Sequence, residues 1–521
     1  MQGRTYLPIL FAGLGVLAGA SCNAITGADD FTIDKHRASK DDGDGGSDTG
    51  GGGITTTGVG GGTSSGGGTT TTAPPQAVGA APGVFLAAVR MYQGLERPLM
   101  EGGAPASSSI PVVAGRDALV RIFVATDGSY NGAPVVAHLF VGDGATPLEV
   151  IQPATNSTQN NMGSTFNFQV PGALIQPGAG YRVELGFANA TGAPAAYPAQ
   201  GYEALPAQSS GAQVRVKLVP VAYGADGSNR LPDTSDAQIQ RYHDRFLAMY
   251  PVPAVEITVH AAVNWQSSIS AYGNGWDSLL NSLANLRAQE GAPDDVYYYG
   301  IFEPASSFGQ FCGGGCVAGL GMIGDPGDSY SRAAIGLGYT GEESADTAVH
   351  EVGHNHGRQH APCGGASGVD PGFPHPGAQI GVWGFDRQHN QLVDPSVTDL
   401  MGYCFPIWIS DYTFSALFNR IKQVNGAQIV VPQDQLDRTY EQIAIAPDGT
   451  ATWNPPMKLH RPPMGEAKTV TLATASGPIT VTGAFFPYDH LDGGILFVQQ
   501  PADVATGLSV DLDGKLVQLF R

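Results

Sequence analysis

Residues 350–360, HEVGHNHGRQH, restrict the fold of this chain more than any other part of its sequence. His350 and His354 are four positions apart. Because an α-helix completes a turn in about 3.6 residues, both imidazoles project from one face of a helix. Gly357 can adopt a positive φ and end that helix, which brings His360 back as a third nitrogen ligand. The spacing predicts a metal site built from three histidines.

The same segment predicts the chemistry of the site. Three protein ligands leave one coordination position open, which is typical of catalytic zinc, whereas structural zinc has four protein ligands. Glu351 follows His350, and in H-E-x-x-H this carboxylate lies beside the metal-bound water, whose pKa zinc lowers to about 7. Glu351 is then placed to accept the proton. His356 lies six positions after His350, about 240° around the helix, so we expect it to be exposed and to point away from the metal.

The residues before the motif alternate between strand and helix patterns. Period-2 or short apolar runs predict strands at 214–223, 254–263, 296–302 and 333–337, and helical spacing predicts helices at 236–250 and 276–289. This order indicates a mixed sheet with helices packed on it. Thr340 and Glu343 match a capping box that would begin the motif helix.

HEVGHNHGRQH resembles the extended zinc signature H-E-x-x-H-x-x-G-x-x-H of the metzincin metallopeptidases. The resemblance implies a zinc metalloendopeptidase with one catalytic Zn²⁺ bound by His350, His354 and His360. Metzincins also carry a turn whose methionine lies under these histidines, and Met401 in DLMGYC is similar to it. In some metzincins a tyrosine two residues later stabilises the oxyanion of the reaction. Tyr403 therefore either acts in this way or packs under the site.

Two further features follow from the resemblance. The helix that metzincins place after the methionine turn is matched by SDYTFSALFNRIKQ, with Ser410 as its candidate N-cap. The apolar face of this helix carries Phe414, Leu417, Phe418 and Ile421. The metzincin layout also implies that the strand at 333–337 lies at the edge of the sheet and pairs with an extended substrate.

β patterns flank this region on both sides. The alternating runs ALVRIFVA and VVAHLFVG predict a β-sandwich at 81–210, and KTVTLATASGPITVTGAFF predicts a β-rich domain at 428–521. We therefore expect a multidomain protein, in which an α/β (α+β) metzincin-like catalytic domain at 211–427, with a mixed sheet and an active-site helix, lies between two β domains. Neither flank shows a group of catalytic residue types, so we expect spacer or recognition modules there.

The first 22 residues resemble a bacterial-type export signal, with Arg4 before an apolar stretch at 7–17. Cys22 lies in a segment similar to a lipobox and is a candidate lipid anchor. Residues 23–80 are mainly Gly, Ser, Thr and Asp, which predicts a disordered linker. No segment is long and apolar enough for a transmembrane helix. These features predict an outer-surface lipoprotein or a secreted protein.

The charge balance excludes one class of partner. The chain has 46 acidic and 26 basic residues and a formal net charge of −20. Such a chain does not form the positive surface that nucleic-acid binding requires.

The cysteines suit an oxidising compartment. Apart from Cys22 there are four, at 312, 316, 363 and 404, which is enough for two disulfides. A bridge between Cys363 and Cys404 would fasten the segment after the third histidine to the methionine turn, and Cys312 and Cys316 could close a small loop. Four cysteines permit three pairings, and a structural zinc held by four thiolates is the alternative.

Two functions are compatible with this pattern. The first is an exported or surface-tethered zinc endopeptidase that hydrolyses polypeptide or glycoprotein substrates. The second is a non-catalytic surface binding or adhesion module that retains the metzincin scaffold. Glu351 favours the first, because a scaffold needs the histidines but not a general base. The sequence contains no cysteine switch of the PRCGxPD kind, so it indicates no mechanism of latency.

Overall fold

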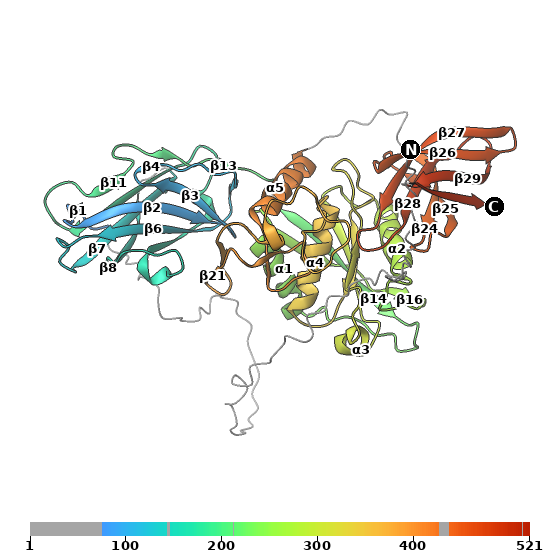
Figure 1. Cartoon of the computed structure of the whole chain (residues 1–521), viewed down its shortest axis with the longest axis horizontal. Coiled ribbons are helices and arrows are strands. Elements are labelled where there is room, and N and C mark those ends of the chain that lie inside the picture. Colours follow the sequence, from blue (N-terminus) through green and yellow to red (C-terminus); the bar gives the residue numbers. More distant parts are fainter. Residues whose placement is uncertain (1–74, 143–145, 212, 427–436, 513) are drawn as a thin grey trace, which may run out of the picture.

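A computed structural model describes residues 75–142, 146–211, 213–426, 437–512 and 514–521. The N-terminal strands, a middle part and a C-terminal sheet lie in a row along the longest axis of the molecule (Figure 1). The predicted signal segment, Cys22 and most of the predicted linker lie outside the described residues. None of the described helices is long and apolar enough to cross a membrane.

The N-terminal part consists of two main sheets around one apolar core. The first sheet has the order β4 (Ala104–Pro105), β3 (Glu96–Glu101), β2 (Val84–Tyr92), β6 (Ala118–Thr126) and β9 (Phe166–Val170). The second has the order β1 (Val78–Gly79), β10 (Gly180–Ala188), β7 (Pro134–Gly142) and β8 (Leu148–Pro153), with β11 (Ala195–Tyr197) and β12 (Glu203–Ala204) also on β10. A small parallel pair joins β5 (Val112–Val113) to β13 (Ala207–Gln208). The predicted runs at 118–125 and 135–142 are strands of this part.

The period-2 pattern explains why these residues form sheets with one covered face. In β10, Tyr181, Val183 and Leu185 are buried, while the residues between them are only partly buried. Successive side chains of a strand point to opposite faces, so this alternation places one row in the core.

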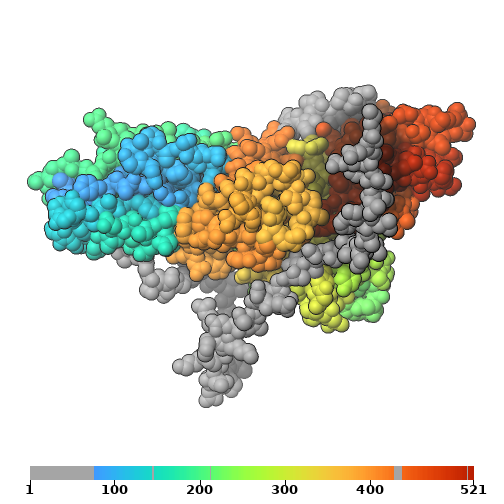
Figure 2. Space-filling view, viewed as in Figure 1, coloured from blue at the N-terminus to red at the C-terminus, as the bar shows by residue number. Residues whose placement is uncertain are grey.

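A buried arginine joins the N-terminal part to the middle part, whose surfaces meet in the space-filling view (Figure 2). The guanidinium of Arg116 donates to the backbone oxygens of Leu247, Ala248, Tyr250 and Val252 at 2.6, 3.1, 2.5 and 2.8 Å. These carbonyls belong to the C-terminal end of helix α1 (Asp236–Met249) and the residues after it. The cation therefore satisfies carbonyl groups that the helix itself leaves without partners.

The middle part contains a mixed sheet, as predicted. Its order is β15 (Val255–Val259), β14 (Val214–Tyr223), β17 (Val296–Phe302), β19 (Ala333–Leu337) and β18 (Gly319–Gly321), and β16 (Val263–Trp265) also pairs with β14. All of these strands are parallel except β18, which is antiparallel to β19. The prediction that 333–337 is an edge strand is wrong, because β19 lies between β17 and β18. The strand at this edge of the sheet is β18, and β15 lies at the opposite edge.

Helices cover both faces of this sheet. Tyr297, Tyr299 and Ile301 of β17 lie in one core with α1, α4 (Glu342–Asn355) and α5 (Asp411–Gly426). Val296 and Tyr298, on the other face, lie in a second core with α2 (Trp276–Gln289). Burial on both faces explains why β17 is a continuous apolar run rather than an alternating one. The short helix α3 (Phe308–Cys312) precedes β18.

The sequence predicted the start of α5 correctly but not that of α4. The capping box at the start of α4 is wrong: the N-cap is Gly341, and Thr340 donates instead to Asp233 at 3.1 Å. The amide of Gln238, on α1, pairs with both backbone groups of Gly341 and so replaces the cap. The Ser410 cap of α5 is confirmed, because its hydroxyl accepts from the backbone N–H of Thr413 at 3.0 Å.

Two small sheets lie between α4 and α5. One pairs β20 (Gly384–Asp386) with β21 (Gln391–Val393), and the other pairs β22 (Thr398–Asp399) with β23 (Ile407–Trp408).

The C-terminal part is a seven-stranded antiparallel sheet. Its order is β25 (Ala451–Leu459), β24 (Arg438–Ile445), β28 (Gly494–Gln499), β27 (Gly477–Pro487), β26 (Glu466–Thr474), β29 (Ala505–Leu512) and β30 (Lys515–Phe520). Tyr440, Phe486 and Phe497 of this sheet lie in the same apolar core as α2. The C-terminal sheet is therefore packed firmly against the middle part, and the loop between β27 and β28 reaches the edge strand β18 through a bridge between Met322 and Tyr488.

Candidate active site

The three histidines of the motif lie together, as the sequence predicted. His350 and His354 project from α4, and their Nε2 atoms are 3.1 Å apart. Gly357 has a φ of 78°, and a Cβ atom there would lie 2.1 Å from the Arg420 guanidinium. The turn at Gly357 therefore requires glycine both for its backbone angle and for space. It returns the chain so that a ring nitrogen of His360 lies within 4.8 Å of ring nitrogens of the other two.

Backbone carbonyl groups orient all three imidazoles. Each Nδ1–H donates to a backbone oxygen, His350 to Leu400 at 2.7 Å, His354 to Arg358 at 2.6 Å and His360 to Ser367 at 2.5 Å. A carbonyl oxygen only accepts, so Nδ1 carries the proton and Nε2 keeps its lone pair for a metal. Burial lowers the pKa of all three rings, that of His354 to about 4. The rings are therefore neutral near pH 7, which is the form that binds metal ions.

Met401 packs directly under the histidine helix. A Cβ atom at Gly353 of α4 would lie 2.6 Å from the Met401 sulfur, so only glycine allows this approach. The buried carboxylate of Asp399 accepts from the backbone N–H groups of Met401 and Ser410 at 2.8 and 2.9 Å. The Met401 oxygen accepts from the N–H of Ala361 at 2.9 Å. The Met401 oxygen thus bonds the turn to the segment that follows the third histidine, and Asp399, which was not predicted, bonds the turn to Ser410 before α5.

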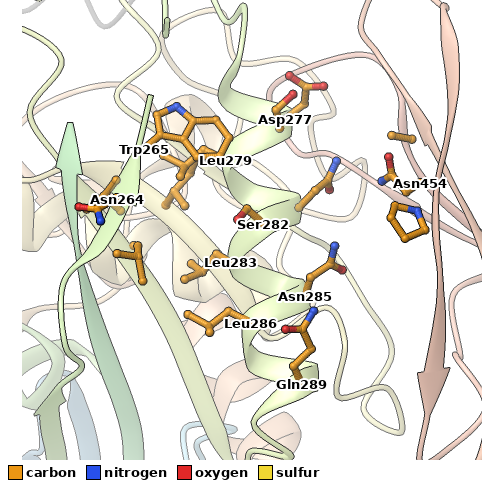
Figure 3. A pocket seen from close by; sticks show the side chains of 18 of the residues that line it. Asn264, Trp265, Asp277, Leu279, Ser282, Leu283, Asn285, Leu286, Gln289 and Asn454 are labelled. Carbon is orange, nitrogen blue, oxygen red and sulfur yellow. The ribbon is translucent and has the colours of Figure 1, made fainter. Parts of the chain in front are cut away.

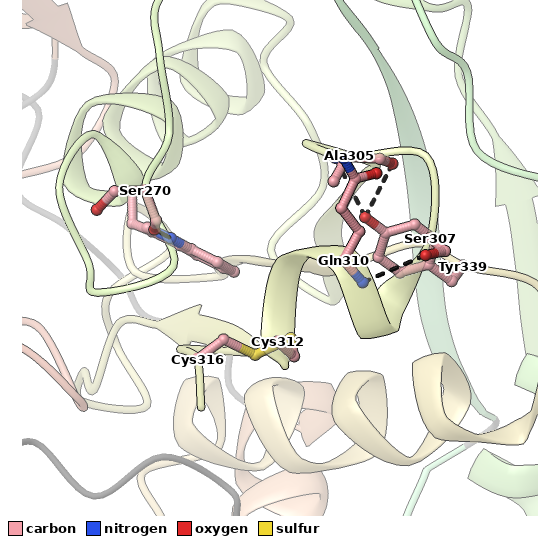
Figure 4. Close-up of a disulfide and its surroundings, with 8 residues drawn as sticks. Ser270, Ala305, Ser307, Gln310, Cys312, Cys316 and Tyr339 are labelled. Atoms are coloured by element: carbon pink, nitrogen blue, oxygen red, sulfur yellow. Dashed lines mark hydrogen bonds between the residues drawn. A yellow bond between two sulfur atoms is a disulfide. The ribbon is translucent and has the colours of Figure 1, made fainter. Parts of the chain in front are cut away.

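The four cysteines of the described residues form two pairs. Cys363 and Cys404 are bridged with Cα atoms 5.7 Å apart, and Cys312 and Cys316 with Cα atoms 4.8 Å apart. The first pair joins the segment after His360 to the methionine turn. Figure 4 shows the second pair at the end of α3. The alternative of one zinc held by four thiolates is wrong.

Figure 4 also shows how the segment around α3 is held. The hydroxyl of Ser307 accepts from the backbone N–H of Gln310 at 3.2 Å and so caps the short helix. The hydroxyl of Tyr339 donates to the oxygen of Ala305 at 3.0 Å and accepts from its N–H at 3.2 Å. Hydrogen bonds therefore hold the start of this segment, and the disulfide holds its end, before the chain enters β18.

Glu351 lies next to the histidines in a nearly closed environment. It is 2% exposed, and a Cβ atom at Gly319 would lie 2.2 Å from its Oε1. Its Oε1 accepts from Nε2 of His490 at 3.2 Å, whereas Oε2 has no hydrogen-bond partner. Burial, and then the nearby Asp489, raise the pKa of Glu351. A carboxylate with a raised pKa is a better proton acceptor at neutral pH than an ordinary glutamate.

Asp489 and His490 complete the cluster and were not predicted. Both lie in the loop between β27 and β28, so the C-terminal flank, for which we expected a spacer or recognition module, contributes two side chains to the histidine cluster. Asp489 Oδ1 accepts from the backbone N–H of Gly321 at 2.8 Å. Burial alone would raise the pKa of Asp489, but the neighbouring His490 and His354 lower it, so it is ionised. The only signal in the sequence is an Asp-His pair between two apolar strands, which does not indicate its partners.

Tyr403 lies beside the cluster, where the resemblance placed it. Its hydroxyl oxygen is 3.1 Å from Nε2 of His360. The same hydroxyl is hydrogen-bonded to Nδ1 of His490.

The prediction that His356 is exposed is wrong. His356 is 2% exposed, and its ring stacks on Tyr297 with centroids 4.3 Å apart. Its Nδ1–H donates to the oxygen of Val352 at 2.8 Å. The ring does point away from the other histidines, but the opposite face of α4 packs against the sheet instead of solvent. Burial lowers the pKa of His356 to about 3.

The five side chains His350, His354, His360, Asp489 and His490 suit a metal ion, because one ligand atom from each lies within 4.8 Å of the others. Asp489 Oδ2 is 3.1 Å from Nε2 of His354 and forms an ion pair with Nε2 of His490 at 2.8 Å. An ionised oxygen 3.1 Å from an imidazole lone pair is placed to share a metal ion with it. Imidazole nitrogens with a carboxylate oxygen are a donor set typical of zinc.

The cluster is enclosed, and a sizeable cavity lies elsewhere. His354 and His360 are 0% and 1% exposed. The cavity, of about 650 Å³, lies between α2 and the C-terminal sheet (Figure 3). Its lining includes Trp265, Asn285 and Asn454 but no residue of the cluster.

The chain was compared with known proteins by sequence. The Peptidase M66 family matches residues 323–404, a range that contains the three histidines, Glu351, Met401 and Tyr403. No curated protein matches the chain. The matched range, together with the histidine cluster, supports the assignment of this chain to a metallopeptidase family.

Proposed function

We propose that this chain is an exported, zinc-dependent endopeptidase of the metzincin type that hydrolyses peptide bonds of extracellular proteins or glycoproteins. The observation that carries the proposal is the set of three imidazoles whose Nδ1–H groups are bonded to backbone oxygens, so that three Nε2 atoms converge beside the buried Glu351. The match to a peptidase family supports the same class of reaction.

Zinc bound by His350, His354 and His360 would supply Lewis-acid activation of water and of the substrate carbonyl. Glu351 would accept the proton of the attacking water and deliver it to the leaving amine. Its raised pKa suits both steps, because the protonated form must be accessible at neutral pH. A binding module would not need this buried carboxylate.

The surroundings of the cluster support roles for two further elements. The hydroxyl of Tyr403 lies next to His360 and would donate to the oxyanion that forms at the attacked carbonyl. The edge strand β18 passes the catalytic glutamate and would pair with an extended substrate. This places the substrate strand on β18 instead of β19.

Localisation is part of the proposal. The signal-like residues at 1–22 and the lipobox-like Cys22 support export with either a lipid anchor or free secretion. The two disulfides are consistent with an oxidising compartment.

The test compares cleavage of a broad peptide library by zinc-loaded full-length variants. Because Asp489 helps to enclose the site, both the wild-type chain and Asp489→Ala are assayed. Each is compared with the same chain that also carries Glu351→Gln. We expect Glu351→Gln to retain zinc and to lose roughly 10²- to 10⁴-fold in kcat/KM, the usual contribution of a general base. A chelator should abolish cleavage, and His360→Ala should lower zinc occupancy.

Failure of the proposal has a clear form. If neither the wild type nor Asp489→Ala cleaves any peptide that its Glu351→Gln counterpart leaves intact, the chain is a binding module that retains a metal site.

A further inference from the structure

We propose that Asp489, from the loop between β27 and β28, is a fourth protein ligand of the metal, and that this loop holds the peptidase in a latent state. The inference rests on the proposed function, because latency has meaning only for an enzyme. It concerns a part of the chain that lies outside the matched family range, since that range ends at residue 404.

The first observation is the position of the Asp489 carboxylate. Its side chain is completely buried, and its Oδ2 lies 3.1 Å from Nε2 of His354 and 2.8 Å from Nε2 of His490. The Nε2 atoms of His350 and His354 are also 3.1 Å apart. Four ligands around zinc, with bonds of about 2.0 Å, lie about 3.3 Å from one another. The distance from Asp489 Oδ2 to His354 Nε2 therefore matches that between two ligands of one zinc ion, and a carboxylate bound in this way would take the position that a catalytic site keeps for water.

The second observation is that the loop lies along the edge strand. Tyr488 forms an antiparallel bridge with Met322, directly after β18, and Asp489 Oδ1 accepts from the N–H of Gly321. An added substrate strand would use the same edge and its N–H groups. Asp489 thus competes with substrate for the N–H of Gly321 on the edge strand as well as for the metal.

The third observation concerns the two side chains proposed to act in catalysis. His490 donates from Nε2 to Glu351 at 3.2 Å and is bonded through Nδ1 to the Tyr403 hydroxyl. Both the general base and the oxyanion donor are therefore engaged by one residue of the loop. Together, Asp489 and His490 engage the metal position, the general base and the oxyanion donor, which are the three groups that the proposed reaction needs.

The loop, not the whole C-terminal sheet, is the part that must move. Tyr488 is fixed at its base, because its hydroxyl exchanges hydrogen bonds with the Asn281 side chain at 2.9 and 3.2 Å. Phe486 and Tyr488 also lie in the apolar core shared with α2. Displacing that core would expose large apolar surfaces, whereas moving residues 489–492 would expose Asp489, His490 and a single apolar side chain, Leu491, which is only partly buried against that core.

The test uses the full chain with Asp489→Ala and, as a matched control, Asp492→Ala on the same loop, where Asp492 is exposed. Three quantities are measured: zinc affinity, the visible absorption of the cobalt(II)-substituted protein, and kcat/KM on a flexible peptide. We expect Asp489→Ala to weaken zinc binding at least about 10- to 100-fold. Loss of a group that only supports a metal ligand already has an effect of this size, and Asp489 is proposed to be a ligand itself. Its cobalt spectrum should change as a water replaces the carboxylate, and kcat/KM should rise roughly tenfold or more. Asp492→Ala should leave all three unchanged.

The outcomes separate this inference from the proposed function. An unchanged cobalt spectrum and zinc affinity in Asp489→Ala would refute the ligand assignment. A changed spectrum with loss of cleavage would refute latency, because Asp489 would then be a required ligand of the working enzyme. The expected metal results without cleavage by any variant would support the ligand and refute the peptidase. Asp489→Asn, which keeps the side-chain volume, gives the same readings should the alanine variant fail to fold.

Discussion

Substituting Gly319 by alanine should inactivate the site without unfolding the protein. Gly319 lies in β18, and an added Cβ would be 2.2, 2.5 and 2.6 Å from Oε1, Cδ and Cγ of Glu351. Contacts between such atoms are comfortable at about 3.5 Å, so the carboxylate must move by roughly 1 Å. The atoms in conflict belong to the end of a flexible side chain, so the glutamate moves and the backbone stays.

The expected magnitude follows from this displacement. A misplacement of about 1 Å in a catalytic group can cost about 10²-fold in rate. We therefore expect kcat/KM to fall roughly 10²-fold in Gly319→Ala, with zinc affinity unchanged, because the histidines are not in conflict with the new methyl group. The assay is peptide cleavage by the zinc-loaded chain, with and without Asp489→Ala, so that latency does not hide the effect.

The matched control is Gly309→Ala in the neighbouring helix α3, where an added Cβ meets no atom within 4 Å. This variant should retain full activity. Full activity in Gly319→Ala would refute the argument, because it would show that Glu351 need not occupy its observed position. A large loss of thermal stability in Gly319→Ala would also refute it, because the strand would then have moved.

Three further predictions test the framework of the site. Arg116→Met should lower the free energy of unfolding by about 3 kcal/mol or more, because several buried charge-assisted hydrogen bonds to α1 are lost; thermal unfolding measures this, and an unchanged transition would contradict it. Replacing Cys363 and Cys404 by serine opens a loop of sequence separation 41 and should lower the free energy of unfolding by about 4 kcal/mol. Thermal unfolding measures this as well, and equal stability of the two proteins would contradict the prediction. Tyr403→Phe should lower kcat more than it changes KM if the hydroxyl acts in the transition state; equal kinetics would leave Tyr403 a packing residue.

Much of the site could be predicted because its signals are local. The i, i+4 spacing of His350 and His354 places two imidazoles on one helix face whatever surrounds the helix. A glycine after the second histidine allows the return of His360, and the structure confirms its positive φ. The cap at Ser410 and the apolar face of α5 were predictable for the same reason, since each depends on residues within a few positions.

The wrong predictions concern what lies against these local elements. His356 points away from the other histidines as the helix period requires, but whether that direction leads to water or to Tyr297 depends on the sheet beneath α4. The capping box failed because Gln238, from another helix, binds Gly341. The strand at 333–337 was correctly predicted as a strand, but its neighbours decide whether it is an edge.

By itself, the sequence determined the main helices and strands around the site and the grouping of three imidazoles with the adjacent carboxylate, because helix periodicity and turn geometry act over a few residues. Only the tertiary structure decided what closes the site. His490 reaches Glu351 across 139 positions of sequence, from a loop between two strands of a different part of the chain. The packing of the C-terminal sheet against α2 sets that contact, and packing between distant segments leaves no periodic pattern in either of them.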